Sequence, residues 1–321
     1  MLDSKFKASI IIVSYNNFHD TTGLCMQSLM QDDSHLGYEV IIVDNASDNE
    51  TQKCLNEFNK INNIKIIFND ENKGFAAANN IGLAAASSGI YILLNSDTVV
   101  PSGALKLLVG KLEDNPNWGA VGPMTNSVGN EQLLNCIGEC PQDTFKEAKL
   151  WLANTIKLNI ESTQLSFFCV AFSRDTWIQV GDLDERFGQG YYEDVDYCIR
   201  ISSTGRSLIV AEDVFVYHRG GKSFSQVPLG VKSLMKKNRR QLLNKHKAIG
   251  RKNLIHLREA NLKVIEQYLD ITNKEDLKSL TYRYNKRVEL ALQQFPRSLL
   301  KKILYKKKLN QVFKRWESIL N

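Results

Sequence analysis

Three groups of acidic residues in this chain have types and spacings that suit catalysis or ligand binding. Asp44 ends one apolar run, and Asp97 follows another with two polar residues between them. The third group, Glu193-Asp194-Val195-Asp196, follows a loop rich in aromatic residues and glycine. An apolar run that ends in a carboxylate is typical of a buried parallel strand whose C-terminal end opens into a ligand crevice. Carboxylates gathered there can hold a divalent metal, a nucleotide and a general base.

Each of these residues also has a purely structural explanation. Asp44 either accepts hydrogen bonds from a base or ribose or caps a turn. Asp97 either binds Mg²⁺ or Mn²⁺ on a diphosphate or forms an Asx turn. Three acids within four residues repel one another, so the third group needs a counter-charge, a metal or a helix N-terminus. His218, after an apolar run, is either a metal ligand or a structural histidine.

A loop at residues 72–80 has the sequence Asn-Lys-Gly-Phe-Ala-Ala-Ala-Asn-Asn. Gly74 and the small residues permit close backbone approach, and the N-terminus of a following helix favours phosphate. The structural alternative is a tight loop that leads into a packed alanine-rich helix.

Short apolar runs alternate with helical patterns in the first 122 residues. Strands are expected at residues 8–13, 38–43, 64–68, 91–94 and 119–122, and helices near 20–31, 51–58, 76–86 and 105–112. This alternation predicts an α/β protein with parallel βαβ units in a mainly parallel sheet that carries helices on both faces. Further strands are expected at 167–172, 207–210 and 214–217, a helix at 195–203, and only helices after residue 230.

Charge divides the chain into two parts. Residues 222–321 hold 25 Lys and Arg against 7 Asp and Glu, a net charge of +18, whereas residues 1–221 hold 16 against 28, a net charge of −12. The acidic part suits catalytic and metal-binding carboxylates, and the basic part suits an anionic surface, either membrane or nucleic acid. We therefore predict two regions, a catalytic domain at 1–228 and a basic helical extension at 229–321.

The last helix is expected to be amphipathic. Apolar residues recur every three or four positions from Leu299 to Leu320, and lysines and arginines fill many of the others. Such a helix can lie on an anionic bilayer, or its apolar stripe can pack on the protein or on another subunit. Nucleic acid is not expected as a partner, because the basic region lacks interleaved aromatic residues and any known binding motif.

The sequence also predicts where the protein resides. No apolar run approaches the ~20 residues that span a bilayer, and residues 1–8 lack the apolar segment of a signal peptide. We expect a cytoplasmic protein, with peripheral contact at the cytoplasmic face of the inner membrane if the last helix binds lipid. Six scattered cysteines without a Cys-x-x-Cys pair do not suggest zinc.

The order of the motifs is more specific than any one of them. The series is Ser14-Tyr15-Asn16, Val43-Asp44-Asn45, the 72–80 loop, Asn95-Ser96-Asp97, Gly181-x-Leu-Asp-Glu-Arg-Phe187, Glu193-Asp194-x-Asp196 and His218. Over residues 8 to about 225 it resembles the family 2 glycosyltransferases, which have the GT-A fold, and among them the bacterial rhamnosyltransferase-like branch.

The resemblance implies an inverting, metal-dependent transfer of a sugar from dTDP-rhamnose or a UDP-hexose. The acceptor would be a hydroxyl of a growing, lipid-linked bacterial surface polysaccharide, such as O-antigen, capsule or cell wall. Asp194 would be the catalytic base, Glu193 would orient the acceptor, and Asp97 and His218 would bind Mg²⁺ or Mn²⁺. The nucleotide-sugar would contact Ser14, Tyr15, Asp44, Gly74, Asn80, Asn95, Ser96 and Asp97. The acceptor or donor sugar would contact Asn126, Asn130, Gln132, Asp196 and Arg200.

One departure from the family pattern motivates an alternative. Asn95 stands where the Asp-x-Asp motif of the family has its first acid, so metal binding rests on Asp97 and His218. A non-catalytic nucleotide-sugar-binding scaffold of a polysaccharide-assembly complex is the other interpretation. An enzyme requires Asp97, Asp194 and His218 to lie within a few ångströms of one hollow of pyrophosphate size. The donor, acceptor, linkage, metal and oligomeric state stay open.

Overall fold

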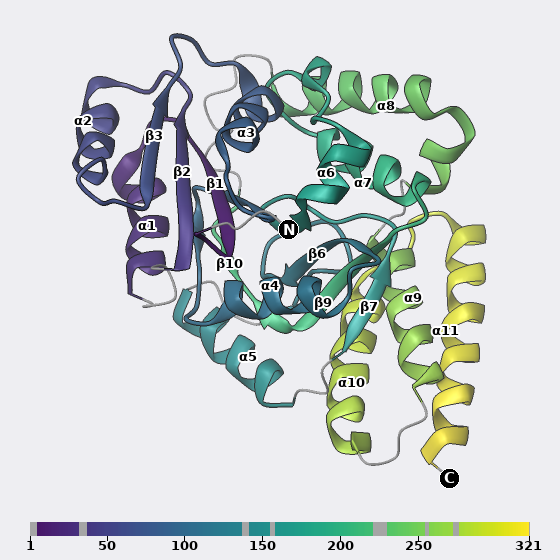
Figure 1. Cartoon of the computed structure of the whole chain (residues 1–321). Helices are drawn as coiled ribbons and strands as arrows, with labels where there is room; N and C mark the ends of the chain where they lie inside the picture. The colour runs from purple at the N-terminus through teal and green to yellow at the C-terminus, as the bar shows by residue number, and fades with distance from the viewer. Residues whose placement is uncertain are drawn as a thin grey trace.

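A computed structural model describes residues 5–31, 37–136, 141–154, 158–220, 230–253, 257–271 and 276–320. Its centre is a mixed, mainly parallel sheet in the order β3-β2-β1-β4-β8-β6-β9-β7, with helices on both faces (Figure 1). The predicted fold class is therefore confirmed, including the helices at the C-terminal end. A small antiparallel pair joins β5 (Thr98–Val99) to β10 (Tyr217–His218).

The first four strands of the large sheet are parallel and carry the predicted motifs at their C-terminal ends. They are β1 (Ala8–Ser14), β2 (Tyr38–Asp44), β3 (Ile64–Phe68) and β4 (Ile90–Asn95). Ser14 pairs in register with Asp44, and Val13 pairs with Asn95. The β-branched, buried residues of these strands are typical of a sheet covered on both faces. The register brings the strand-end side chains to one edge.

The second half of the sheet mixes strand directions. It contains β6 (Trp118–Met124), β7 (Asn159–Ser162), β8 (Cys169–Ser173) and β9 (Ser207–Phe215). Strand β8 lies antiparallel between β4 and β6, and β9 runs parallel to β6. The prediction of two strands at 207–210 and 214–217 is wrong in part, because β9 continues through the charged pair Glu212-Asp213. Strand β7 was not predicted.

Helices of the catalytic part connect these strands. They are α1 (Thr22–Met30), α2 (Asn49–Phe58), α3 (Gly74–Ala85), α4 (Ala104–Asp114), α5 (Pro141–Ala153), α6 (Arg174–Val180) and α7 (Glu193–Ser203). Asp48 begins α2 as an N-cap, since its carboxylate accepts from the Thr51 N–H at 2.8 Å. Helix α5 was not predicted, because its few buried residues give a weak apolar pattern.

Four helices follow: α8 (Val231–Asn253), α9 (Leu257–Asp270), α10 (Leu277–Gln293) and α11 (Leu299–Leu320). Helix α10 is tied to the sheet through Glu212, which is fully buried in the middle of β9. Its carboxylate contacts Arg283 at 2.7 Å and Arg287 at 2.6 Å. Burial raises the pKa of Glu212, but the two guanidinium groups lower it by more, so the carboxylate is held ionised. These ion pairs explain how β9 can continue through Glu212 although this residue is charged.

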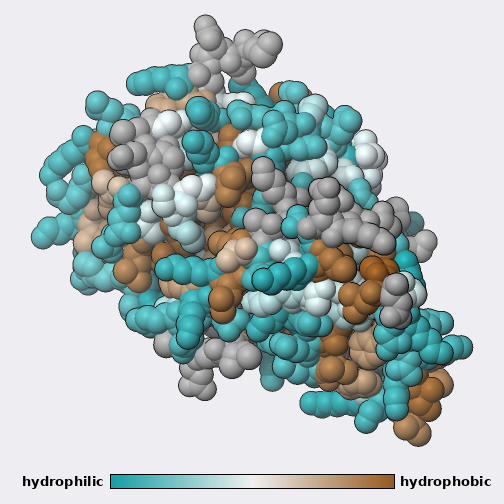
Figure 2. Space-filling view, turned by 90° about the horizontal axis from the view of Figure 1, so that it is seen from below, coloured by the Kyte–Doolittle hydropathy of each residue, from teal (hydrophilic) through white to brown (hydrophobic). Residues whose placement is uncertain are grey.

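Helix α11 uses only part of its apolar stripe to pack on the protein. Tyr305, Leu309, Val312 and Trp316 are buried, and the Trp316 ring stacks on Tyr284 at 4.1 Å. The first turns instead expose Leu299, Leu300, Ile303 and Leu304. Apolar patches lie among hydrophilic side chains on the right of Figure 2, where α9, α10 and α11 lie together in Figure 1. In the described part of the chain, no helix combines the length and hydropathy that a membrane span requires.

Candidate active site

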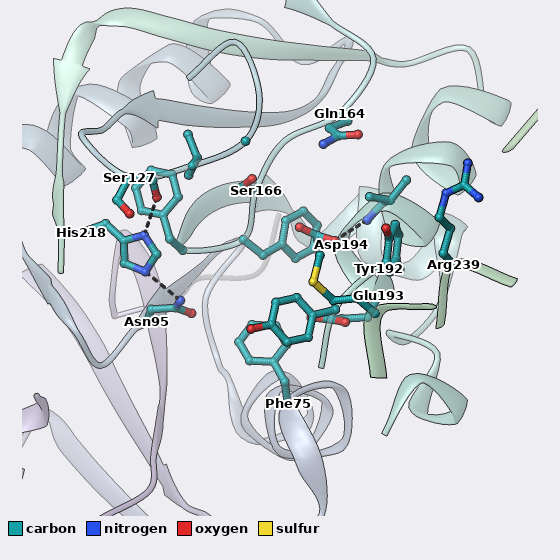
Figure 3. Close-up of a pocket in the computed structure, with 17 residues that line it drawn as sticks. Phe75, Asn95, Ser127, Gln164, Ser166, Tyr192, Glu193, Asp194, His218 and Arg239 are labelled. Atoms are coloured by element: carbon teal, nitrogen blue, oxygen red, sulfur yellow. Dashed lines mark hydrogen bonds between the residues drawn. The ribbon is translucent and has the colours of Figure 1, made fainter. Parts of the chain in front are cut away.

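A cavity of about 480 Å³ lies at the C-terminal edge of the parallel strands. His218 and Asn95 line one side of it, and Asp194, Glu193, Tyr192 and Arg239 line the other (Figure 3). The remaining lining residues come from α3, the loop after β6, the segment before β8, the turn before α7, α7 itself, and α8: Phe75, Ser127, Val128, Gly129, Gln164, Ser166, Phe167, Phe168, Tyr191, Val195 and Met235. Two acids and one imidazole predicted from the sequence therefore share one cavity.

Asp194 and Glu193 stand in the first turn of α7. The Val195 N–H donates to Asp194 Oδ1 at 2.8 Å, and the helix N-terminus favours a carboxylate there. Burial nevertheless raises the pKa of Asp194 to about 6, because it outweighs the backbone N–H groups. Burial and the Asp194 charge raise the pKa of Glu193 further. The pair therefore suits proton exchange near neutral pH.

Glu193 is only 6% exposed, and its Oε2 atom has no hydrogen-bond partner among the described residues. A buried polar atom without a partner is costly unless a ligand or water satisfies it. Because Glu193 lines the cavity, a bound hydroxyl group is a fitting partner for that oxygen.

The turn before α7 has an unusual backbone. Tyr191 and Tyr192 have φ angles of 71° and 76°, in the left-handed region that side chains other than glycine rarely adopt. Such conformations persist where surrounding contacts over-determine them, and they cluster at functional sites. Gly74, at φ 83°, stands against this turn, since a Cβ there would overlap the Gly188 carbonyl. Gly74 therefore positions the turn through close backbone approach.

His218 connects the cavity to Asp97. Its Nδ1 lies 3.0 Å from the Ser127 carbonyl oxygen, which can only accept, so Nδ1 carries a proton. Nε2 then faces Asp97 Oδ1 at 3.3 Å and the Asn95 amide at 3.5 Å. Burial lowers the pKa of His218, but Asp97 and the Ser127 carbonyl raise it by more. The pair places one nitrogen and one oxygen 3.3 Å apart, and both atoms are of types that coordinate divalent metals.

Asp97 itself does not line the cavity. It borders a neighbouring hollow of about 330 Å³, with Arg219, Phe145 and Tyr217 among the other lining residues. Asp97 and Ser96 are both buried. Within the described residues, no three His, Cys, Asp or Glu side chains are grouped as a metal site. Asp97 and His218 contact each other, and their role as the two protein ligands of a metal stays a prediction.

Asp44 and Ser14 lie together at the ends of β1 and β2. Asp44 is fully buried, and its Oδ2 accepts from the Ser47 N–H and the Gln52 amide at 3.1 and 3.2 Å. Its Oδ1 has no partner among the described residues. Ser14 shares a hydrogen bond with Thr22, and Tyr15 beside it is half-buried. A free carboxylate oxygen at this edge suits an N–H or hydroxyl donor of a ligand.

The three candidate sugar-binding residues of the 124–132 segment have different hydrogen-bond partners. The Asn126 amide binds the His218 backbone in both directions, at 2.9 and 3.0 Å, and so holds the imidazole in place. Asn130 and Gln132 are buried and bind each other at 3.1 Å, and the Gln132 amide also donates to the Pro123 carbonyl. None of the three lines the cavity, whereas Ser127, Val128 and Gly129 do.

Three other residues predicted to contact ligands instead form hydrogen bonds and ion pairs within the protein. The Asn80 amide donates to the Leu183 carbonyl and accepts from the Leu183 N–H, both at 2.9 Å. Asp196 is fully buried and accepts from Arg200 at 2.9 Å and from His246 at 2.6 Å. Asn80, Asp196 and Arg200 therefore contact protein groups in this structure.

Sequence reasoning missed the cavity residues that come from α8 and from the segment before β8. Met235 and Arg239 lie in the region assigned to the C-terminal extension. Gln164 and Ser166 precede a strand without any motif. No local signal marks these residues, because they reach the cavity only through packing of segments that are distant in the chain.

Comparison with known proteins identifies the family. The sequence model described as "Glycosyl transferase family 2" matches residues 9–174, just over half of the chain. The glucosyl-dolichyl phosphate glucuronosyltransferase of Haloferax volcanii is 23% identical over 228 residues, which are 66% of this chain and 69% of that protein.

Two solved structures share the fold. GalNAc-T7 with UDP, GalNAc and Mn²⁺ aligns with a TM-score of 0.59 and 18% identity, over 87% of this chain and 55% of that one. A mannosyltransferase of Pyrobaculum calidifontis with GDP-Man and Mn²⁺ aligns with a TM-score of 0.51 and 17% identity, over 99% and 84%. These neighbours support the GT-A architecture, and the family match shows that the chain belongs to family 2 of the glycosyl transferases.

Proposed function

We propose that the chain transfers a sugar from a nucleotide-sugar to a hydroxyl group of a lipid-linked polysaccharide acceptor, with inversion at the anomeric carbon. The observation that carries this proposal is the placement of Asp194 across one cavity from His218, which contacts Asp97. Asp194 takes the proton of the acceptor hydroxyl as its oxygen attacks the anomeric carbon in line. A single displacement inverts the configuration, and Glu193, protonated near neutral pH, orients the acceptor.

The leaving diphosphate belongs on the His218 side of the cavity. Asp97 and His218 would hold Mg²⁺ or Mn²⁺, and the metal, when bound, would offset the charge that builds on the diphosphate. Two protein ligands leave the rest of an octahedral shell to phosphate oxygens and water, so metal and nucleotide should bind together. Two structural neighbours contain Mn²⁺ with a nucleotide or nucleotide-sugar, which supports this assignment.

The nucleotide is proposed to bind along the ends of β1 and β2. The unpartnered Asp44 oxygen would accept from a base N–H or a ribose hydroxyl, with Ser14 and Tyr15 beside it. The donors predicted from the resemblance, dTDP-rhamnose and a UDP-hexose, remain the first to test. A glucuronosyl and a mannosyl donor join the panel because the relative and one neighbour carry those sugars in their names.

The acceptor is proposed to be membrane-bound, since the Haloferax relative is named for a dolichyl phosphate substrate. Leu299 and Leu300 at the start of α11 are 74% and 68% exposed, beside a run of lysines. Exposed apolar side chains with lysines suit an anionic bilayer, where each lysine contributes about 1 kcal/mol. We propose that this end of α11 contacts the cytoplasmic face of the membrane.

Flotation with liposomes that contain anionic lipid tests this contact. The double variant Leu300→Ser with Ile303→Ser should float less than the wild type, without loss of thermal stability, because both side chains point away from the core. Ile178→Ser is the matched control, since Ile178 is 66% exposed on α6. Equal flotation of all three proteins would reject the membrane surface.

Release of nucleotide across the donor panel, with Mn²⁺, Mg²⁺ or EDTA, tests the catalytic proposal. One donor should give metal-dependent release, and NMR of the product should show an inverted anomeric configuration. Binding of a donor without release or transfer to any lipid-linked acceptor would favour the alternative, a nucleotide-sugar-binding scaffold. Activity in EDTA equal to that in Mn²⁺ would contradict the metal assignment.

A further inference from the structure

Helix α8 holds the turn that precedes the proposed base. Asn238 of α8 is fully buried, and its side-chain amide nitrogen lies 2.8 Å from the Phe187 carbonyl oxygen, 2.8 Å from that of Gly190 and 3.1 Å from that of Tyr191. Three acceptors around one nitrogen identify it as the NH₂ end of the amide. One side chain therefore gathers three backbone carbonyl groups of the turn.

These carbonyl groups need a donor from outside the turn. Gly188, Gly190, Tyr191 and Tyr192 all have positive φ, so the segment forms no regular helix or strand. A buried carbonyl without a partner is costly, and non-glycine residues at positive φ persist only where surrounding contacts hold them. The amide of Asn238 supplies the hydrogen bonds that secondary structure would otherwise provide.

The same face of α8 makes two more contacts with the catalytic region. Leu242, four residues after Asn238, packs with Phe187, Val195 and Ile199 in a buried cluster. His246, four residues further on, binds Asp196 of α7 at 2.6 Å. Residues spaced by four share one face of a helix. Helix α8 thus contacts the turn and α7 on both sides of Asp194 in the sequence.

We propose that Asn238 is a positioning residue for Asp194, and this inference rests on the proposed function. Its two N–H groups, shared among the three carbonyl oxygens, set the path of residues 187–192 and hence the place at which α7 begins. The start of α7 sets the direction in which the Asp194 carboxylate meets the acceptor hydroxyl. Asn238 itself is absent from the cavity lining, and its side-chain hydrogen bonds to described residues go to this turn. Misplacing a catalytic group by about 1 Å can slow a reaction by about 10²-fold.

Asn238→Leu tests the proposal, because leucine has a similar size and no donor. Asn261→Leu is the matched control: Asn261 is also fully buried on a helix, its amide donates to the Arg287 carbonyl, and neither residue lines the cavity. Both variants should lose thermal stability. Only Asn238→Leu should lower kcat by about 10²-fold, with the affinity for the donor nucleotide changed less than about twofold.

Hydrogen exchange of residues 187–194 gives a readout that does not require turnover. The exchange should rise in Asn238→Leu and stay at the wild-type level in Asn261→Leu. Equal kcat for the two variants, or unchanged exchange in the turn, would overturn the role of Asn238. An inactive wild type would instead reject the proposed function, and the exchange result would still decide whether Asn238 holds the turn.

Discussion

The raised pKa of Asp194 predicts how the reaction rate depends on pH. With a pKa of about 6, about 97% of this carboxyl group is ionised at pH 7.5 and about 9% at pH 5. Because only the ionised form accepts a proton, kcat/KM should fall about tenfold between these values. An ordinary aspartate with a pKa of 3.8 would lose less than about a tenth of the rate over the same interval.

The assay is nucleotide release at saturating Mn²⁺, which would favour the unprotonated form of His218 if this residue binds the metal as proposed. Asp194→Asn should lower kcat by about 10²–10⁴-fold, since the general base is lost while nucleotide binding survives. Asp270→Asn is the control, because Asp270 is exposed and pairs only with Arg315.

Thermal stability gives a second measure of the same group. The pKa of Asp194 is higher in the folded state than its ordinary value, so ionisation of Asp194 destabilises the folded protein. The stability that the protonated form contributes is therefore lost as the pH rises from about 4 through about 6. The Tm of Asp194→Asn relative to wild type should therefore increase over that window. A rate that is flat down to pH 5, together with near-normal turnover of the variant, would refute the assignment of Asp194 as the base.

Three further predictions concern the surroundings of Asp194. The difference in Tm between Glu193→Gln and wild type should become more positive as the pH rises from 5 to 9, because the raised pKa of Glu193 means that its ionised form destabilises the fold. A difference in Tm that does not change with pH would contradict this. Gly74→Ala should lose about 1–3 kcal/mol of unfolding free energy and reduce kcat, since its Cβ meets the Gly188 carbonyl. Gly103→Ala, in the left-handed region with a similar φ of 78° and open space around a Cβ, should lose only about 1 kcal/mol and keep its kcat. His218→Gln should raise the Mn²⁺ concentration for half-maximal activity by at least about tenfold; an unchanged value would remove His218 from the metal site.

Much of the first half of the fold was predictable from local patterns. The buried runs that end in Ser14, Asp44 and Asn95 are strands in the structure, and Asp48 caps the helix that follows the second of them. These features depend on a few neighbouring residues, and the parallel direction follows from the alternation with helices. His218, which was expected just after a strand, is instead the last residue of the short strand β10.

Other features required contacts between distant segments. The continuity of β9 depends on Arg283 and Arg287, which lie about 70 residues beyond Glu212. Gln164 and Ser166, in the segment before β8, reach the cavity because β8 lies between β4 and β6 in the sheet. Asn126 was expected beside a sugar and instead holds the His218 backbone, a contact between residues 92 positions apart. Neither hydrophobic periodicity nor a local motif predicts contacts between residues so far apart in the sequence.

The residue types and their order in the chain determined the family, the acidic strand ends and the candidates for base and metal ligand. Each of these is a local property, because a strand, its terminal carboxylate and the turn that follows are encoded within a few positions. Tertiary packing alone decided that Asp194 and His218 face one cavity, that Asp97 stands behind the imidazole, and that α8 supports the catalytic turn. The reason is that burial, pKa and the partners of a buried amide all depend on which distant segments come to lie against it.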